Sequence, residues 1–223
     1  DKRIAEGDAP AMCGLPIGIK DLFCTKGVPS QAGSRILEGF LPEYESTVSQ
    51  NLFDNGAVML GKLNMDEFAM GSSNETSVYG NAVNPWRRGN DDAALTPGGS
   101  SGGAAAAVAS GICAIGHGTD IGGSIRYPAY ACGLHGLRPT LGRVAAYNAS
   151  GSERHIGGQM MAVSGPITRT IDDCRLALMA MSAEDLRDPW WTPAPIEQGD
   201  FPKRAALCVA PEGLQVDNRI EKA

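Results

Sequence analysis

The sequence lacks a hydrophobic run long enough to cross a membrane, and it is poor in residues that hold metal ions. No stretch of about 18 consecutive apolar residues occurs, and the first ten residues lack the apolar core of a signal peptide. The three histidines, His117, His135 and His155, are spread along the chain. We therefore expect a cytoplasmic protein with no membrane contact and no metal site.

Cysteine pairs, charge runs and nucleotide-binding motifs are missing as well. The six cysteines are scattered and include no CxxC pair, which indicates reduced thiols rather than disulfides. The net charge of −6, without any basic cluster, argues against direct nucleic-acid binding. Neither GxGxxG nor GxxxxGK[ST] occurs. We expect no cofactor.

What the sequence does contain is typical of one globular α/β domain over residues 1–223. Hydrophobic residues make up 43% and charged residues 20% of the chain, which is an ordinary globular composition. Helical and strand-like segments alternate, so we expect a sheet covered by helices. The predicted helices are 46–55, 102–110 and 170–181, a further one begins near 216, and the predicted buried strands are 57–63, 112–116 and 204–210.

Two serines stand in glycine-rich segments, and the first of these segments is GTDIGGSIR around Ser124. The glycines leave several backbone N–H groups sterically open, and such groups can converge on the oxyanion of a tetrahedral intermediate. Ser124 would then be an exposed nucleophile. A glycine turn with an incidental serine explains this short segment equally well.

The second segment, GGSSGG, contains Ser100 and Ser101 and directly precedes the alanine-rich helix. Such hexamers also occur as plain linkers, but a helix and a returning strand can bring Ser100 back to Ser124. No histidine has an acidic partner at a telling spacing, so a base would have to be a desolvated lysine. Lys20 in the apolar stretch GLPIGIKDLF is the candidate, and a surface lysine is the alternative.

Three segments together, GIKDLF, TPGGSSGG and GTDIGGSIRYPA, resemble the amidase signature family in their order and spacing. The resemblance implies a mixed β-sheet with helices on both faces, of which this chain forms only a part. It makes Ser124 the nucleophile, Ser100 the bridging serine after a cis peptide bond, and Lys20 the base. The implied oxyanion hole comprises Ile121, Gly122, Gly123 and Ser124. The implied supporting residues are Ser101, Asp120 and Arg126.

The two halves of the chain resemble different branches of that family. GKLNMDEFAMGSSNETSVYGN is similar to the glutaminase component of glutamyl-tRNA(Gln) amidotransferase, which works with partner subunits. The segment from Ile112 onward, with Ile121 and Tyr127, is closer to stand-alone amidases, so the chain has the features of a hybrid. Three functions stay open. They are a hydrolase of small carboxamides, a glutaminase component of an amidotransferase, and a truncated, non-catalytic scaffold prone to form homo-oligomers.

Overall fold

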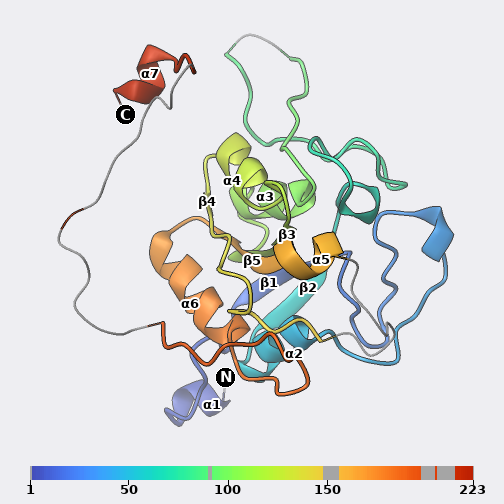
Figure 1. Cartoon of the computed structure of the whole chain (residues 1–223), viewed down its shortest axis with the longest axis vertical. Helices are drawn as coiled ribbons and strands as arrows, with labels where there is room; N and C mark the ends of the chain where they lie inside the picture. The colour runs from blue at the N-terminus through green and yellow to red at the C-terminus, as the bar shows by residue number, and fades with distance from the viewer. Residues whose placement is uncertain (1, 90–91, 148–155, 197–203, 205–213, 223) are drawn as a thin grey trace.

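A five-stranded mixed β-sheet forms the centre of the computed structural model, which describes residues 2–89, 92–147, 156–196, 204 and 214–222 (Figure 1). The strand order is β2-β1-β3-β5-β4. β1 runs parallel to β2 and β3, whereas β5 runs antiparallel to β3 and β4. The strands are β1 (Pro16–Lys20), β2 (Val58–Leu63), β3 (Ile115–Asp120), β4 (His135–Gly136) and β5 (Val163–Thr168).

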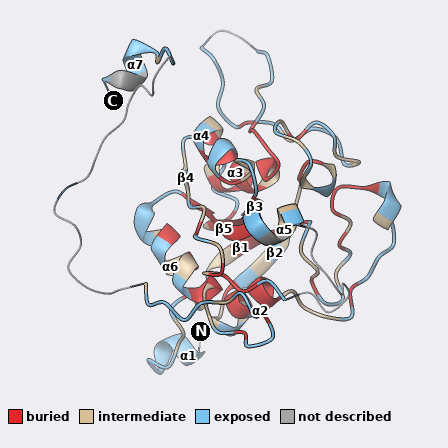
Figure 2. Cartoon of the chain, viewed as in Figure 1, coloured by how far each residue is buried: buried red, intermediate tan, exposed pale blue. Residues whose placement is uncertain are grey.

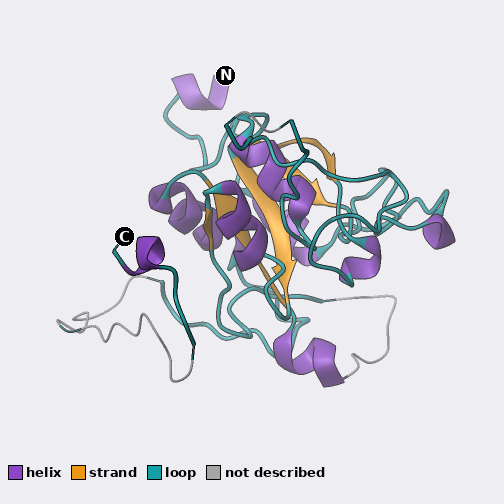
Figure 3. Cartoon of the chain, turned by 90° about the horizontal axis from the view of Figure 1, so that it is seen from above, coloured by secondary structure: helices purple, strands orange, loops and turns teal. Residues whose placement is uncertain are grey.

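Helices cover both faces of this sheet, as the view in Figure 3 shows. On one face, α2 (Thr47–Asp54) and α6 (Ile171–Met181) pack onto Ile17, Ile19 and Ile115. On the other face, α3 (Gly102–Ala109) and α4 (Arg126–Cys132) pack onto Ile167. The expected α/β class with helices on both faces is confirmed. The remaining helices are α1 (Lys2–Ala5), α5 (Ile156–Met161), α7 (Asn218–Glu221) and the short 3-10 turns η1 (Arg35–Leu37) and η2 (Glu67–Ala69).

The helices begin and end close to where the sequence predicted. Ser46 is the N-cap of α2, and Gly56 follows its end with a φ of +87°, a left-handed conformation that glycine adopts without strain. In α6 the amide of Asp173 donates to the Thr170 hydroxyl at 3.1 Å, which is a capping interaction that this spacing of Thr and Asp favours. Its Cys174 and Met181 are buried, whereas Ile171 at the first turn is exposed.

α3 consists of small residues, and Figure 2 colours much of this helix as buried. The alanines at 104 and 105 are fully buried. A Cβ added to Gly116 of β3 would lie 3.0 Å from the Ala104 carbonyl oxygen, and one added to Gly103 would lie 2.4 Å from the Asn64 carbonyl oxygen. Because no larger residue fits, the N-terminus of α3 is held directly against β1, β3 and the loop after β2.

Two predicted strands differ from what is observed. β2 was expected to be buried, but it is an edge strand, with Val58 and Leu60 more than half exposed. The expected strand 112–116 is observed as β3 at Ile115–Asp120, so it begins three residues later and ends four residues later than expected. Pairing with β1 on one side and β5 on the other outweighs the weak strand preference of Gly118 and Asp120.

Two of the elements that were not predicted are β5 and α4. The segment 163–168 contains Gly165 and Pro166, which argue against a strand, but it is the fully buried strand β5, in which Pro166 pairs with His117. The helix α4 begins at Arg126, two residues after Ser124. The predicted strand 204–210 lies outside the described residues except for residue 204.

Candidate active site

Four polar side chains meet where β1 and β3 end. Neighbouring parallel strands present their carboxyl ends at the same edge of a sheet, so Lys20 at the end of β1 lies beside Thr119 of β3. The N-terminus of α3 adds Ser100 and Ser101 to this point. Segments that are 80 and 99 residues apart in sequence thus form one cluster.

The Lys20 side chain is fully buried and is surrounded by hydroxyl groups. Its Nζ lies 2.7 Å from Ser100 Oγ, 2.9 Å from Ser101 Oγ and 2.8 Å from Thr119 Oγ1. These are hydrogen-bond distances. The geometry does not fit a surface lysine whose amine reaches into water.

Burial makes this amine far less basic than an ordinary lysine. Removal from water disfavours the ammonium form and lowers the pKa of Lys20 from 10.5 to about 7. The negative charges of Asp66 and Asp120 oppose this effect by favouring the ammonium form. Near neutral pH both forms of the amine are therefore populated, which suits proton transfer.

The two neighbouring serines have different surroundings. The peptide bond Gly99–Ser100 is cis, and the Ser100 carbonyl accepts from the Asp66 amide at 3.2 Å. The Ser101 hydroxyl donates to the Thr119 carbonyl oxygen at 3.4 Å and accepts from Lys20 Nζ. Although Ser101 is the N-cap residue of α3, its side chain makes no capping bond, because the hydroxyl is engaged with Lys20 and Thr119.

Ser124 lies next to this cluster through its backbone. Its carbonyl oxygen accepts from the Ser101 amide at 3.2 Å, and the residue is half-buried. Within the described part of the chain, the Ser124 hydroxyl makes no hydrogen bond. The structure thus joins Lys20 directly to Ser100 and places Ser124 beside them without a bond between the two serine hydroxyls.

Asp120 organises the turn that carries Ser124. Its carboxylate accepts from the amides of Gly123 (2.9 Å), Ile125 (3.1 Å) and Arg126 (3.3 Å). The Arg126 guanidinium binds the same carboxylate at 2.9 and 3.1 Å, and Arg138 approaches to 3.4 Å. Burial raises the pKa of Asp120, but these hydrogen bonds outweigh it and hold the pKa at about 2.

Of the backbone amides in this turn, some bind Asp120 and others are open to a ligand. The Gly123 amide, which the sequence assigned to the oxyanion hole, donates to Asp120. In the described residues, the amides of Ile121, Gly122 and Ser124 have no partner, so these three are the donors open to a ligand. A Cβ on Gly122 would meet nothing within 4 Å, which leaves room above the turn.

Two residues of the cluster were missed in the sequence. Thr119 binds Lys20, and its place directly before Asp120 in GTDIGGS was the available signal. Asp66 is fully buried beside Ser100, and nothing in its segment indicated this. His117 is fully buried and packs on Phe23, with ring centroids 3.9 Å apart.

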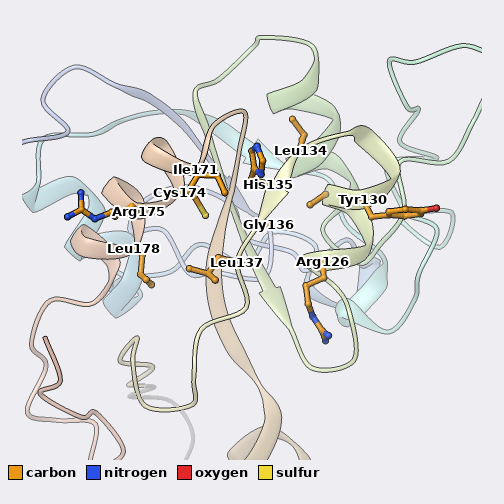
Figure 4. A pocket seen from close by; sticks show the side chains of 11 residues that line it. Arg126, Tyr130, Leu134, His135, Gly136, Leu137, Ile171, Cys174, Arg175 and Leu178 are labelled. Carbon is orange, nitrogen blue, oxygen red and sulfur yellow. The ribbon is translucent and has the colours of Figure 1, made fainter. Parts of the chain in front are cut away.

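A cavity of about 590 Å³ lies between α4, β4 and α6 (Figure 4). Its lining is mostly apolar, with Leu134, Leu137 and Leu178 among the contributing side chains. Arg126 is the one predicted site residue that lines it; Lys20, Ser100 and Ser124 do not. The described residues contain no group of His, Cys, Asp and Glu side chains that could hold a metal ion, and none of their helices is long and apolar enough to cross a membrane.

Known proteins share both the sequence and the fold of this chain. Residues 1–211 match the family described as Amidase. The A subunit of glutamyl-tRNA(Gln) amidotransferase from Jannaschia sp. (strain CCS1) is 62% identical over 201 residues, which cover 90% of this chain and 39% of that relative. This alignment is long enough to include segments on both sides of the alanine-rich helix.

Two solved structures resemble the chain closely. The A subunit of glutamyl-tRNA(Gln) amidotransferase from Thermotoga maritima has a TM-score of 0.72 at 36% identity, over 83% of this chain and 40% of that one. A bacterial aryl acylamidase of the amidase signature enzymes has a TM-score of 0.75 at 32% identity, over 86% of this chain and 39% of that one. The chain spans about 39% of the length of the curated relatives it matches. It belongs to the amidase family, that of the amidase signature enzymes.

Proposed function

We propose that the chain is a serine amidohydrolase that cleaves the C–N bond of linear carboxamides through Ser124, Ser100 and Lys20. The observation that carries this proposal is the 2.7 Å contact between Lys20 Nζ and Ser100 Oγ at a fully buried amine. A lysine can act as a general base near neutral pH only if its pKa is lowered. Burial lowers the pKa of Lys20 to about 7.

The hydrogen bonds around the amine are compatible with its neutral form. A neutral amine has two N–H donors and one lone pair. Ser101 directs its own hydrogen towards the Thr119 carbonyl, and so Ser101 accepts from Lys20. Thr119 Oγ1 accepts the second N–H. The Ser100 hydrogen has no other acceptor in the described residues, which leaves it directed at the Lys20 lone pair.

The reaction then follows as an acyl transfer. Lys20 takes the Ser100 proton while Ser100 takes that of Ser124, whose side chain must rotate towards Ser100 to close the relay. The Ser124 oxygen bonds to the amide carbon, and the amides of Ile121, Gly122 and Ser124 stabilise the oxyanion. The C–N bond breaks as the relay returns the proton to the departing ammonia or amine. Water hydrolyses the acyl-enzyme by the same path.

The test is ammonia release by the purified chain from small aliphatic and aromatic amides, asparagine and glutamine. Ser124→Ala should abolish turnover. Ser110→Ala is the matched control, because that exposed hydroxyl only binds the Ala106 carbonyl at the end of α3. Equal turnover by the wild type and Ser124→Ala would refute the assignment of the nucleophile.

A second candidate function is the glutaminase activity of an amidotransferase. It is favoured by the 62% identity to the Jannaschia protein. In this case ammonia would come from glutamine only, and adding the other amidotransferase subunits of that relative would raise the rate. The chain itself would make no direct contact with nucleic acid. If the folded protein released no ammonia from any of these substrates, the result would favour the non-catalytic scaffold.

A further inference from the structure

Asp66 is a buried carboxylate that the proposed mechanism does not use. It follows β2, and its residue is fully shielded from solvent. The carboxylate accepts from the amides of Asn74 (3.0 Å) and Glu75 (3.2 Å) and from the Thr76 hydroxyl (3.1 Å). No lysine or arginine of the described residues forms an ion pair with it. Because no neighbouring cation of the described residues offsets its negative charge, this carboxylate can influence titratable groups that it does not contact.

The same residue holds the peptide that carries Ser100. Its amide donates to the Ser100 carbonyl at 3.2 Å. A Cβ added to Gly99 would lie only 2.1 Å from Asp66 Oδ2, so the carboxylate packs directly against Gly99. Around it, Phe68, Ala69 and Asn74 all adopt positive φ, a conformation uncommon for non-glycine residues. The loop is thus built to keep the carboxylate at this peptide.

The charged groups around Lys20 are few, and Asp66 differs from the others. Asp120 of β3 is paired with Arg126 and Arg138, which offset its charge. His117 of β3 is neutral, because burial lowers its pKa to about 3. α3 contributes no titratable side chain, and Lys62 of β2 pairs in register with Ile19, whose side chain lies on the opposite face from that of Lys20.

We infer that Asp66 is a positioning residue for the Lys20–Ser100 pair, because it holds the Gly99–Ser100 peptide through its amide and its carboxylate and adds there a negative charge that has no ion-pair partner in the described residues. This inference rests on the proposed role of Lys20 as the base. It explains why the amine stays partly protonated despite complete burial. Of the two charges that raise the pKa of Lys20, that of Asp66 is the larger influence.

The experiment follows the Lys20 amine directly in the full chain. The lysine side-chain NMR signals are titrated with pH, and the Lys20 signal is assigned by its loss in Lys20→Met. In Asp66→Asn the Lys20 pKa should fall by about one unit. Glu75→Gln is the matched control, since it removes an exposed charge from the same loop and keeps the backbone bond to Asp66. It should leave the Lys20 pKa unchanged.

Activity against pH is measured on the same variants with the amide that the wild type turns over fastest. The acid limb of kcat/KM should move to lower pH in Asp66→Asn by the same amount as the NMR titration. If Asp66→Asn fails to fold, Asp66→Ser makes the same comparison, because its hydroxyl accepts an amide hydrogen bond without charge.

An unchanged or raised Lys20 pKa in the Asp66 variant would overturn the inference. An equal shift in Glu75→Gln would do so too, because the effect would then come from the loop as a whole. The activity measurement tests the proposed function independently of the pKa measurement. A lowered Lys20 pKa in a chain without amidase activity would support the role of Asp66 while refuting the hydrolase.

Discussion

The side-chain amine of Lys20 is buried in the protein interior, out of contact with solvent. At the residue scale its neighbours determine its chemistry, because three oxygen atoms surround Nζ and burial lowers the pKa to about 7. A proton therefore binds the folded chain less tightly than the unfolded one at this position. Catalysis and stability both acquire a pH dependence from this single group.

Lys20→Met is expected to lower kcat/KM for amides by about 10²–10⁴-fold, the usual contribution of a general base. In the wild type, kcat/KM should rise with pH through about 7, because the reaction needs the neutral amine. Steady-state kinetics across this pH range check both statements. Lys26→Met, at an exposed position, serves as the control. A variant without Lys20 that keeps the wild-type rate would contradict the base assignment.

The same residue should affect stability against pH. Between pH 7 and 10.5 the unfolded chain binds a proton at Lys20 that the folded chain does not. The free energy of unfolding therefore receives a contribution that increases with pH across this window. Denaturant unfolding at several pH values should show a smaller increase in Lys20→Met than in the wild type. Identical slopes would mean that the amine is not desolvated in the folded chain.

Thr119→Val tests the residue that the sequence did not reveal. The substitution keeps the shape of the side chain but removes an acceptor from Lys20 Nζ at 2.8 Å. We expect kcat to fall about tenfold or more, with little change in KM, because the hydroxyl orients the base and does not contact substrate. An increase in KM alone, measured on the preferred amide, would instead place Thr119 in the substrate pocket.

At the element scale, the position of α3 depends on its glycines. Its first turn lies so close to the loop after β2 that a Cβ on Gly103 would be 2.4 Å from the Asn64 carbonyl oxygen. Since α3 carries Ser100 and Ser101 at its N-terminus, this packing sets the distance between the serines and Lys20. Small residues in this helix thus position the site.

Gly103→Ala should destabilise the fold by roughly 1–3 kcal/mol, the usual cost of overpacking. Gly61→Ala in β2 is the matched control, because nothing lies within 4 Å of the added Cβ. Thermal unfolding of both variants measures the difference. A Gly103→Ala protein with wild-type stability would show that α3 can move away from the loop.

The elements also show how much of the fold and of the site could be predicted from the sequence. α2, α3 and α6 were predictable because caps and glycines mark their ends. Three motifs predicted Lys20, Ser100, Ser124 and Asp120 as site residues, and the fold places these residues near one another. β5 could not be predicted, since Gly165 and Pro166 argue against a central strand and only its pairing with β3 explains it. The burial of Asp66 is equally non-local, because the Gly99–Ser100 peptide and the loop 64–76 create it jointly.

At the scale of the whole molecule, the sheet ends at a strand with exposed apolar side chains. β2 lies at one end of the strand order, with Val58 and Leu60 exposed. Unpaired strands with apolar side chains tend to associate with other chains. The cavity between α4, β4 and α6 adds a second apolar area at the opposite end of the sheet. The predicted self-association would use such surfaces.

Leu60→Lys should reduce self-association, because a charge on an edge strand opposes edge-to-edge pairing. Sedimentation of the wild type and the variant over a range of concentrations gives the result, with circular dichroism as the check on folding. Lys20 lies on β1 and not on this edge, so amide turnover per folded chain should stay the same. A wild type that remains monomeric at high concentration would rule out this edge as an association surface.

The separation of 99 positions between Lys20 and Thr119 in the sequence has a consequence for protein synthesis. A ribosome makes Lys20 well before Thr119, and the strand β3 that encloses the amine is made only with the latter. Until then the amine is hydrated and has the pKa of an ordinary lysine. Each nascent chain must therefore release this proton, or the water around it, when β3 docks beside β1. Acidic conditions during refolding should slow that docking step.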